Sequence, residues 1–413
     1  MSGDTVIVIG AGASGLFAAY TAATRGKKVV LLEKMHQPGL KLRITGKGRC
    51  NVTNVSELRD FLSHCGSEPR FLYPALQRFF HKELMFFFEN RGVPLIMERG
   101  NRVYPQSGKS LDVFLALVQA VEETSTVIRK NTIVSEILVQ DRCVQGVRLS
   151  NGETIPCEKI ILAAGGQSYP QTGSNGDGVE LARKLGHHIV PCYPSLVGFE
   201  VEEELPKDLM NFTLKNVEAT ISIAETGKKI TSEFGELMFS EQGIEGPVML
   251  TLSRRISSLA ARTPLRLSID FKPALDEDTW EKKCIRDCQA YEGQSVSSLL
   301  RHWVPKPIAA YMACRLPASM IFKSSEKINS GERKHLKRVI RQLDFHLTKP
   351  FGWDRAIVTQ GGVDLKEIVP QTLESKLIHG LWFSGEVMDL DADTGGYNLQ
   401  IAFSTGYLAG SSV

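Results

Sequence analysis

The sequence predicts an α/β fold in which a discontinuous Rossmann-like domain is interrupted by an insertion. Two glycine-rich segments lie at opposite ends of the chain: Gly10–Gly15 follows the apolar run Thr5–Ile9, and Gly385–Gln400 follows a second apolar run. The apolar texture of buried parallel strands stops near Tyr193 and returns near Ala356. These observations indicate one nucleotide-binding domain assembled from both ends of the chain.

The first 35 residues predict a compact β-α-β unit. Thr5–Ile9 and Lys28–Leu32 are short apolar runs typical of buried strands. Between them, Ala13–Thr24 has helix-forming residues with apolar side chains at helical spacing. The following stretch, Met35–Asn54, is rich in Gly, Lys and Arg and is expected to be a loop; long loops inside compact domains are often functional.

The remainder of the first half is expected to complete this domain. Two helices are expected around residues 74–92, because a proline opens the stretch and a glycine closes it. Further elements are expected as follows: a helix over Lys109–Glu123, strands over Ile133–Val139, Cys143–Ser150, Thr154–Pro156 and Glu158–Leu162, and a helix over Gly176–Leu185.

The middle of the chain predicts a β-barrel-like insert and a helical subdomain. Alternating runs such as Val217–Ala224 and Leu265–Phe271 indicate antiparallel strands. Amphipathic helices are expected over Asp276–Tyr291, Gln294–Val304, Lys306–Cys314 and Gly331–Leu343. The resulting division is 1–192 and 346–413 for the discontinuous domain, 193–274 and about 318–345 for the β-rich insert, and 275–317 for the helical subdomain.

Composition narrows the class of protein. The chain has 413 residues, 42% hydrophobic and 23% charged, with a formal net charge of +3. This mild charge neither demands nor excludes a nucleic acid, since binding depends on clustered charge. No apolar run is long enough to cross a bilayer, and no signal-peptide pattern is expected at the N-terminus. Eight scattered cysteines form no CxxC pair, so a soluble, reduced cytoplasmic protein without a metal site or membrane contact is expected.

The first glycine segment matches a dinucleotide-binding fingerprint in spacing and context. Gly10 permits a tight turn, Gly12 lets a diphosphate approach the backbone, and Gly15 lets the helix pack on the strand. The helix N-terminus at Ala13 and Ser14 would direct N–H groups at the phosphates. Glu33 ends the second strand, where a carboxylate binds ribose hydroxyls and repels a 2′-phosphate, which disfavours NADP at this site.

The second glycine segment favours FAD over NAD as the resident cofactor. Gly385, Glu386 and Asp389 follow a strand, and Gly396 and Asn398 precede an expected helix over Gln400–Leu408. A helix N-terminus here would stabilise negative charge on the pyrimidine edge of a reduced flavin. The chain has no second GxGxxG after a strand, so a dedicated NAD(P)H domain is not expected, and NAD(P)H would bind transiently.

Several longer motifs give a more selective signal. The stretch Ile44–Asn54 reads ITGKGRCNVTN, Thr359–Val363 reads TQGGV, and Gly395–Gln400 reads GGYNLQ. Together with Gly385–Asp389, they resemble the GGGRCNxTN signature and its companion motifs in a bacterial flavoprotein family, the BaiN-like or aminoacetone oxidase-like NAD(P)/FAD-dependent oxidoreductases. That family includes bile-acid-dehydroxylating reductases and a ribosomal-RNA dihydrouridine synthase. The resemblance covers essentially the whole chain.

The resemblance implies non-covalent FAD, the three-part architecture and a set of flavin-lining residues. Carried over by position, that set consists of Lys41, Thr45, Gly46, Arg49, Asn51 and Thr53, with Ile133 on the adenine side. One position departs from the glycine-rich form of the signature, because Lys47 stands where it has glycine. This departure weakens any transfer of substrate from the glycine-bearing members.

The complete set of predicted cofactor-binding residues joins both sources. It comprises Gly10, Gly12, Ala13, Ser14, Gly15, Glu33, Lys34, Lys41, Thr45, Gly46, Arg49, Asn51, Thr53, Ile133, Ala164, Gly165, Gly385, Glu386, Asp389, Gly396, Asn398, Leu399 and Gln400. Cys50 is the candidate catalytic residue, as a redox-active thiol or proton donor, although a buried structural thiol is the preferred interpretation.

The predicted function is an FAD-dependent oxidoreductase that transfers hydride between flavin and an organic small molecule, with NAD(P)H as the expected transient donor. An FAD amine oxidase that uses oxygen is one alternative. Reduction of a uridine in ribosomal RNA is another, suggested by the basic helix Gly331–Leu343, although a solvated helix face is the preferred explanation of that helix. The oligomeric state is left open.

Overall fold

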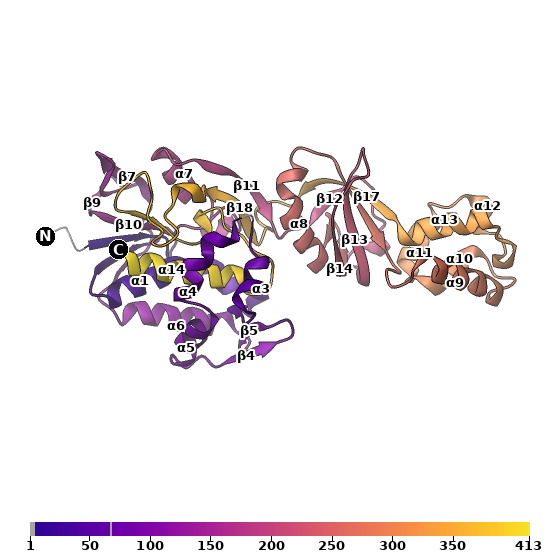
Figure 1. Ribbon diagram of the computed structural model, residues 1–413, viewed down its shortest axis with the longest axis horizontal. Coiled ribbons are helices and arrows are strands. Elements are labelled where there is room, and N and C mark those ends of the chain that lie inside the picture. Colours follow the sequence, from indigo (N-terminus) through magenta and orange to yellow (C-terminus); the bar gives the residue numbers. More distant parts are fainter. Residues whose placement is uncertain (1–4, 67) are drawn as a thin grey trace. The chain divides into compact units, whose positions relative to one another are not determined.

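The computed structural model describes residues 5–66 and 68–413 (Figure 1). The chain divides into two compact units. The first consists of residues 1–195 and 352–413, and the second of residues 196–351. The first unit is therefore built from both ends of the chain.

A five-stranded parallel sheet forms the centre of the first unit, in the order β19-β10-β1-β2-β6. Its strands are β1 (Thr5–Ile9), β2 (Lys28–Leu32), β6 (Val127–Arg129), β10 (Lys159–Leu162) and β19 (Leu381–Phe383). The inner strands are apolar and almost wholly buried, as expected for a parallel sheet covered on both faces. β19, from the C-terminal segment, pairs directly with β10, so the two ends of the chain share one sheet.

Helices α1 (Ala13–Thr24) and α14 (Tyr397–Ser412) pack closely against each other. Glycines on α14 permit this approach: an added Cβ at Gly406 would lie 2.6 Å from the Ser14 carbonyl oxygen, and one at Gly410 would lie 2.4 Å from that of Ala18. Both helices start beside a glycine-rich segment. Their packing therefore fixes the two predicted cofactor segments relative to each other.

Smaller elements complete the first unit. The helices are α2 (Leu40–Ile44), α3 (Leu58–Ser63), α4 (Tyr73–Arg78), α5 (His81–Glu89), α6 (Ser110–Glu122) and α7 (Asp177–Lys184). Three further groups of strands are antiparallel: β3 (Thr53–Asn54) with β5 (Arg102–Pro105) and β4 (Leu95–Glu98); β7 (Val134–Gln140) with β8 (Cys143–Leu149) and β9 (Thr154–Pro156); and β11 (Ile189–Ser195) with β18 (Val358–Val363). The stretch Met35–Asn54, expected to be a loop, thus contains a short helix and the start of a strand.

The second unit contains a closed six-stranded barrel in the order β12-β15-β14-β13-β16-β17. Its strands are β12 (Phe199–Val201), β13 (Thr213–Ile223), β14 (Lys229–Ser240), β15 (Gly243–Glu245), β16 (Leu265–Asp270) and β17 (Leu343–Pro350), and α8 (Pro247–Ala260) packs on β14. On β16, burial alternates residue by residue, so Leu265, Leu267 and Ile269 fill the interior.

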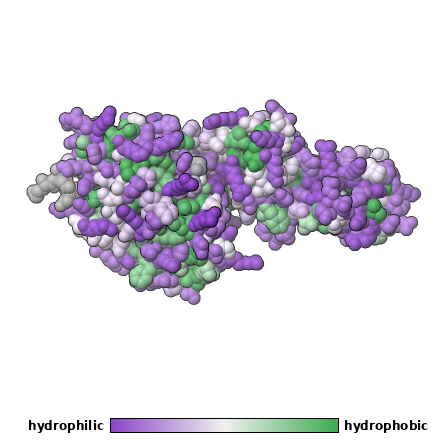
Figure 2. Space-filling model, viewed as in Figure 1, coloured by the Kyte–Doolittle hydropathy of each residue, from purple (hydrophilic) through white to green (hydrophobic). Residues whose placement is uncertain are grey.

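Helices form the rest of the second unit. They are α9 (Glu277–Ala290), α10 (Val296–Trp303), α11 (Lys306–Ala313), α12 (Ala318–Ile321) and α13 (Ser330–Arg341). On the face shown in Figure 2 these helices present mainly hydrophilic residues. β17, which begins at Leu343, joins the barrel. The stretch before it, within the residues 318–345 that we assigned to the β-rich insert, contains the residues of α12 and α13, and α13 agrees closely with the helix expected over Gly331–Leu343. The apolar residues Leu336, Val339 and Ile340 of α13 recur at helical spacing and are buried.

The predicted fold class is confirmed: a Rossmann-like parallel sheet, a closed barrel and a helical part are all present. Within residues 5–66 and 68–413, no helix combines the length and the apolar character that a bilayer crossing requires.

Candidate functional site

The three fingerprint glycines differ in how closely other atoms approach them. An added Cβ at Gly10 would lie 2.6 Å from the Ala163 carbonyl oxygen, and one at Gly15 would lie 1.9 Å from that of Gly10. These two positions are closed by the protein itself, as the turn and the helix–strand contact require. At Gly12, by contrast, an added Cβ would meet no described atom within 4 Å. Gly12 therefore borders open space in which a ligand can approach the backbone.

The N-terminus of α1 faces this open position without a protein cap. Gly12 is the N-cap residue, no side chain hydrogen-bonds there, and the first turn carries no acidic residue. The backbone N–H groups of a helix start carry partial positive charge and attract phosphates. Ala13 and Ser14 lie at this uncapped helix start, and their role in diphosphate binding stays a prediction.

Glu33 lies at the end of β2, buried, and holds the fingerprint loop. One carboxylate oxygen accepts a hydrogen bond from Ala11 N and the other from Met35 N, both at 2.8 Å. A carboxylate oxygen has a second acceptor site, so ribose hydroxyls can still bind. Ile133 is on the same side, since Thr132 N donates to the Glu33 carbonyl oxygen at 2.8 Å.

The second glycine segment meets the first at α1. Ser14 Oγ contacts Ser384 Oγ, and an added Cβ at Gly385 would lie 2.8 Å from Ser14 Cβ. Gly385 N donates to Thr405 Oγ1 at 3.0 Å. Ala164 and Gly165 approach from β10, because an added Cβ at Gly10 would lie 2.8 Å from Ala164 Cα.

A partly buried network of hydrogen bonds joins Lys41 to Glu386, which lies 345 positions later in the sequence. Lys41 Nζ lies 2.7 Å from Glu386 Oε2 and also donates to Ser168 Oγ. The other carboxylate oxygen of Glu386 accepts from Thr359 N at 2.6 Å and from Ser168 Oγ at 3.1 Å. Ser168 and Thr359 were not predicted individually, although Thr359 is the first residue of the TQGGV motif. The network ties the signature loop to the C-terminal segment.

The signature loop has an unusual backbone. Gly46 (φ 57°), Lys47 (φ 56°), Gly48 (φ 85°) and Cys50 (φ 59°) all lie in the left-handed region. Glycine adopts this region freely, whereas a lysine or cysteine is strained there. The glycine that the family signature carries at position 47 is therefore explained by backbone geometry, and Lys47 occupies a conformation that glycine would adopt at lower cost.

Cys50 does not have the environment of a reactive thiol. Its side chain is fully buried, and this burial raises the pKa of the Cys50 thiol to about 12, opposed only by a hydrogen bond with Thr45. The thiol is therefore protonated at neutral pH, and reactive cysteines instead have lowered pKa values. The geometry favours the structural alternative over a thiolate role, and a catalytic role for Cys50 remains a prediction.

Asn51 and Gly396 meet at the start of α14. Gly396 (φ 99°) is the N-cap of α14, without a side-chain cap, and an added Cβ there would lie 2.9 Å from Asn51 Oδ1. Within the described part of the chain, the buried Asn51 Oδ1 atom has no hydrogen-bond partner. A buried polar atom of this kind costs free energy unless a ligand or water satisfies it. This second helix N-terminus is therefore equipped to face a polar ligand edge.

Several predicted cofactor residues have protein partners instead. Arg49 pairs with Glu98 and stacks on the Tyr104 ring at 4.3 Å. Thr53 Oγ1 donates to Gln400 Oε1 at 2.5 Å, and both side chains are fully buried. The Thr53–Gln400 hydrogen bond joins β3 to α14. The cofactor-binding roles of Arg49, Thr53 and Gln400 stay predictions.

Four other predicted residues lie around these segments. Lys34 pairs with Asp177 at 2.6 Å. Asn398 bonds the backbone of Ala392 through both amide atoms and so shapes the loop before α14. Burial raises the pKa of the half-buried Asp389. Leu399 packs against the apolar core of this unit.

A group that the sequence did not reveal lies beside the α14 N-terminus. The His64 ring stacks on Tyr397 with ring centres 4.5 Å apart, and His64 Nδ1 lies 2.9 Å from Asp393 Oδ2. Burial raises the pKa of Tyr397. Asp393 and Tyr397 are close in sequence, but His64 comes from a distant segment, so spacing alone could not have joined it to them.

The described residues fit FAD. Gly12 offers an open diphosphate cradle, Glu33 stands where ribose hydroxyls bind, and Asn51 Oδ1 and the α14 N-terminus await polar partners. The described residues contain no group of three or more His, Cys, Asp or Glu side chains arranged to hold a metal ion.

Comparison with known proteins decides the family. The model described as HI0933-like protein Rossmann domain matches residues 4–412. The chain belongs to this family. The match confirms the resemblance found in the signature motifs.

Two characterised relatives have similar length. The 3-dehydro-bile acid delta(4,6)-reductase of Clostridium scindens is 29% identical over 98% of this chain and 97% of its own. The ribosomal RNA dihydrouridine synthase of Escherichia coli is 29% identical over 97% of this chain and 96% of its own. Family membership, together with a site that fits FAD, confirms the prediction of an FAD-dependent oxidoreductase.

Among solved structures, the fold is similar to that of a 3-ketosteroid-delta4-(5alpha)-dehydrogenase from Rhodococcus jostii. The TM-score is 0.52 at 15% identity, covering 98% of this chain and 96% of the dehydrogenase. At this identity the likeness concerns the fold alone.

Proposed function

We propose that this protein is a reductase that binds one FAD non-covalently and transfers hydride to an organic small molecule, with NAD(P)H as a transient donor. The observation that carries the proposal is a pair of uncapped helix N-termini, at Gly12 and Gly396, on two helices that pack against each other in one unit built from both chain ends. FAD, when bound, supplies the hydride chemistry.

The residues of the chain would bind and orient this cofactor. The α1 N-terminus would hold the diphosphate, and Glu33 the ribose. The α14 N-terminus and Asn51 would face the pyrimidine edge, where a positive helix end favours negative charge. The Lys41–Glu386 network would keep the signature loop closed against the C-terminal segment.

The direction of the reaction is supported by the relatives. The names of both relatives describe reductions, one of a bile acid derivative and one of uridine in RNA. We therefore favour a reductase over an amine oxidase. Neither relative reaches 30% identity, so the substrate itself is not transferred.

Anaerobic stopped-flow measurement of the flavin absorbance tests this proposal. Rapid bleaching by NADPH or NADH is expected, and slow or absent bleaching by amines. Bleaching by a primary amine together with no response to either nicotinamide would contradict a reductase and support the oxidase alternative.

RNA is the second candidate substrate, favoured by the basic helix α13. Arg333, Lys337 and Arg341 pair with acidic residues of the same unit. Lys334 and Arg338 are exposed and form no ion pair with a described residue. An electrophoretic shift with ribosomal RNA fragments at two salt concentrations tests this candidate, because phosphate contacts make binding fall steeply with salt.

We also propose the reducing cytoplasm as the location. All eight cysteines are free thiols, which is the usual state in that compartment. Non-reducing peptide mapping of protein extracted from cells would reveal disulfides if this were wrong.

A further inference from the structure

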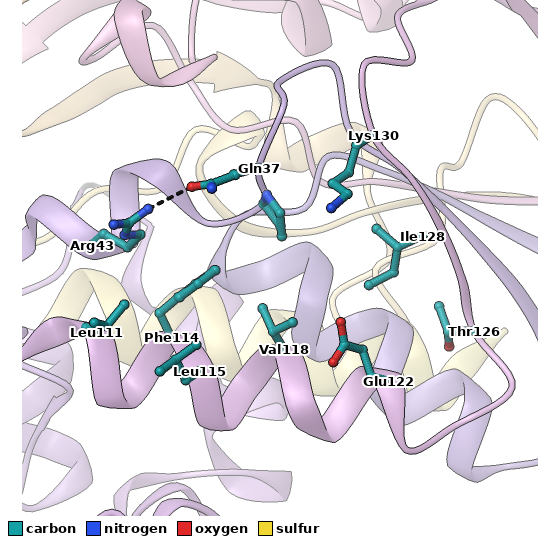
Figure 3. Close-up of a pocket in the computed structure, with 11 residues that line it drawn as sticks. Gln37, Arg43, Leu111, Phe114, Leu115, Val118, Glu122, Thr126, Ile128 and Lys130 are labelled. Carbon is teal, nitrogen blue, oxygen red and sulfur yellow. Dashed lines mark hydrogen bonds between the residues drawn. The ribbon is translucent and has the colours of Figure 1, made fainter.

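A groove of about 600 Å³ lies on the surface of the first unit. It borders the fingerprint loop, since Gly39 N, next to the lining residue Pro38, donates to the Ala11 carbonyl oxygen at 2.8 Å. One wall is helix α6, and the other is formed by β6 and the chain that leads into α2 (Figure 3). The volume is within the range typical of small-molecule sites. None of the residues that line the groove belongs to the predicted cofactor-binding set.

The wall formed by α6 has a second apolar strip that the core does not use. One face of α6 is buried through Val113, Leu117 and Val121. On the groove side, Leu111 and Leu115 are one turn apart yet 42% and 52% exposed. A helix on the surface of a globular protein normally shows polar residues on its outer face. Exposed leucines that line a groove therefore indicate a binding surface.

Two cations line the opposite wall. Arg43 is held in place by Gln37, whose Oε1 accepts from Nη1 at 2.8 Å, and by the Phe114 ring 5.6 Å away. Lys130 follows β6, and Figure 3 shows it on the same side of the groove as Gln37. Within the described part of the chain, neither Arg43 nor Lys130 forms an ion pair, so both charges are available to an anion.

The charges also give the groove a direction. Glu122, the last residue of α6, lines the end opposite Arg43. Leu111 and Glu122 are separated by three turns, or about 16 Å along the helix axis. Lys130 lies at the same end as Glu122 (Figure 3), so that end carries opposite charges, whereas Arg43 has no acidic neighbour among the lining residues. An anionic group is therefore favoured at the Arg43 end, and Leu115, Val118 and Ile128 offer apolar contacts along the groove.

We propose that this groove binds an elongated organic anion, a free carboxylate with an aliphatic body, at a site separate from the cofactor. The carboxylate would pair with Arg43, and the apolar chain would lie along the α6 leucines. This proposal does not depend on the reaction assigned above.

Equilibrium dialysis of labelled dodecanoate, below its micelle concentration, against the FAD-loaded full-length protein tests this site. One saturable site per chain is expected. Arg43→Gln should weaken dodecanoate binding about tenfold, the effect of losing one charged partner, and leave binding of the uncharged dodecanol unchanged. Leu115→Glu should abolish binding of both, because it places a carboxylate on the apolar wall.

A matched control separates a specific site from general stickiness. Leu377 is 36% exposed in the same unit but does not line the groove, so Leu377→Glu should leave binding unchanged. If Leu115→Glu fails to bind FAD or its circular dichroism spectrum shows that it is misfolded, Leu111→Glu serves as the second groove variant. Three results would overturn the proposal. They are the absence of saturable dodecanoate binding, equal dodecanoate binding by the wild type, Arg43→Gln and the leucine variant, or displacement of dodecanoate when FAD is added to the apoprotein.

Discussion

Replacement of Gly12 by alanine should separate cofactor binding from folding. The backbone at Gly12 (φ −77°, ψ −172°) is allowed for alanine, and the added Cβ would meet no described atom within 4 Å. Alanine restricts the unfolded chain more than glycine does, which stabilises the folded protein by about 0.4–1 kcal/mol. Alanine is also a poorer N-cap residue than glycine, which destabilises the folded protein by roughly 0.5–1 kcal/mol. These effects offset each other, so the free energy of unfolding of the apoprotein should change by less than about 1 kcal/mol.

FAD binding should respond far more strongly. The same methyl group would intrude where the diphosphate approaches the backbone, and overpacking of this kind costs about 1–3 kcal/mol. FAD affinity should therefore fall between about 5-fold and 150-fold. Gly15→Ala is the matched contrast: its Cβ would lie 1.9 Å from the Gly10 carbonyl oxygen, so it should destabilise the apoprotein itself.

The assays are urea unfolding of the apoproteins and FAD titration followed by fluorescence. An alanine at position 12 that leaves the FAD dissociation constant unchanged would refute the assignment of the diphosphate to this loop. If Gly12→Ala destabilised the apoprotein as strongly as Gly15→Ala does, the claim that Gly12 borders open space would be wrong.

Three further predictions concern a thiol, a histidine and an ion pair. Because burial raises the pKa of Cys50 to about 12, iodoacetamide at neutral pH should label exposed Cys314 but spare Cys50, as read by mass spectrometry; early labelling of Cys50 would count against a structural thiol. Burial lowers the pKa of His187, so below pH 6.5 the unfolded chain binds a proton that the folded chain does not, and the free energy of unfolding should decrease as the pH is lowered. His187→Gln should make this pH dependence shallower by up to about 1.4 kcal/mol per pH unit in urea titrations. An unchanged pH dependence would be inconsistent with this linkage. A double-mutant cycle of Lys41→Met and Glu386→Gln should give a coupling of about 1 kcal/mol in unfolding free energy, whereas strict additivity would show that the contact contributes nothing.

Local patterns predicted the β-α-β unit accurately. Strand Thr5–Ile9, helix Ala13–Thr24 and strand Lys28–Leu32 agree with the structure at every boundary. Apolar periodicity and glycine punctuation act over a few residues, so the sequence displays them directly. By contrast, helix α8 (Pro247–Ala260) was missed, although its proline occupies a typical first-turn position.

The C-terminal helix shows a boundary error with a physical cause. It was expected to begin at Gln400, whereas α14 begins at Tyr397, directly after Gly396 in the left-handed conformation. The glycine pair favours a loop locally, and packing of α14 along α1 extends the helix.

The site was predictable in its glycine roles but not in its polar partners. The spacing of Gly12 and Gly15 predicted open space beside one backbone and a close helix–strand contact at the other, and the structure has both. Binding of a diphosphate in that space stays a prediction. The partners of Lys41 and Arg49, which are Glu386 and Glu98, depend on how distant segments meet. No pattern along the chain records such contacts.

The amount of FAD bound to the purified full-length protein tests the central claim most directly. One FAD per chain is expected, either retained through purification or taken up when the apoprotein is offered FAD, because both ends of the chain build one cradle. A correctly folded protein that remains colourless and binds no FAD would contradict this.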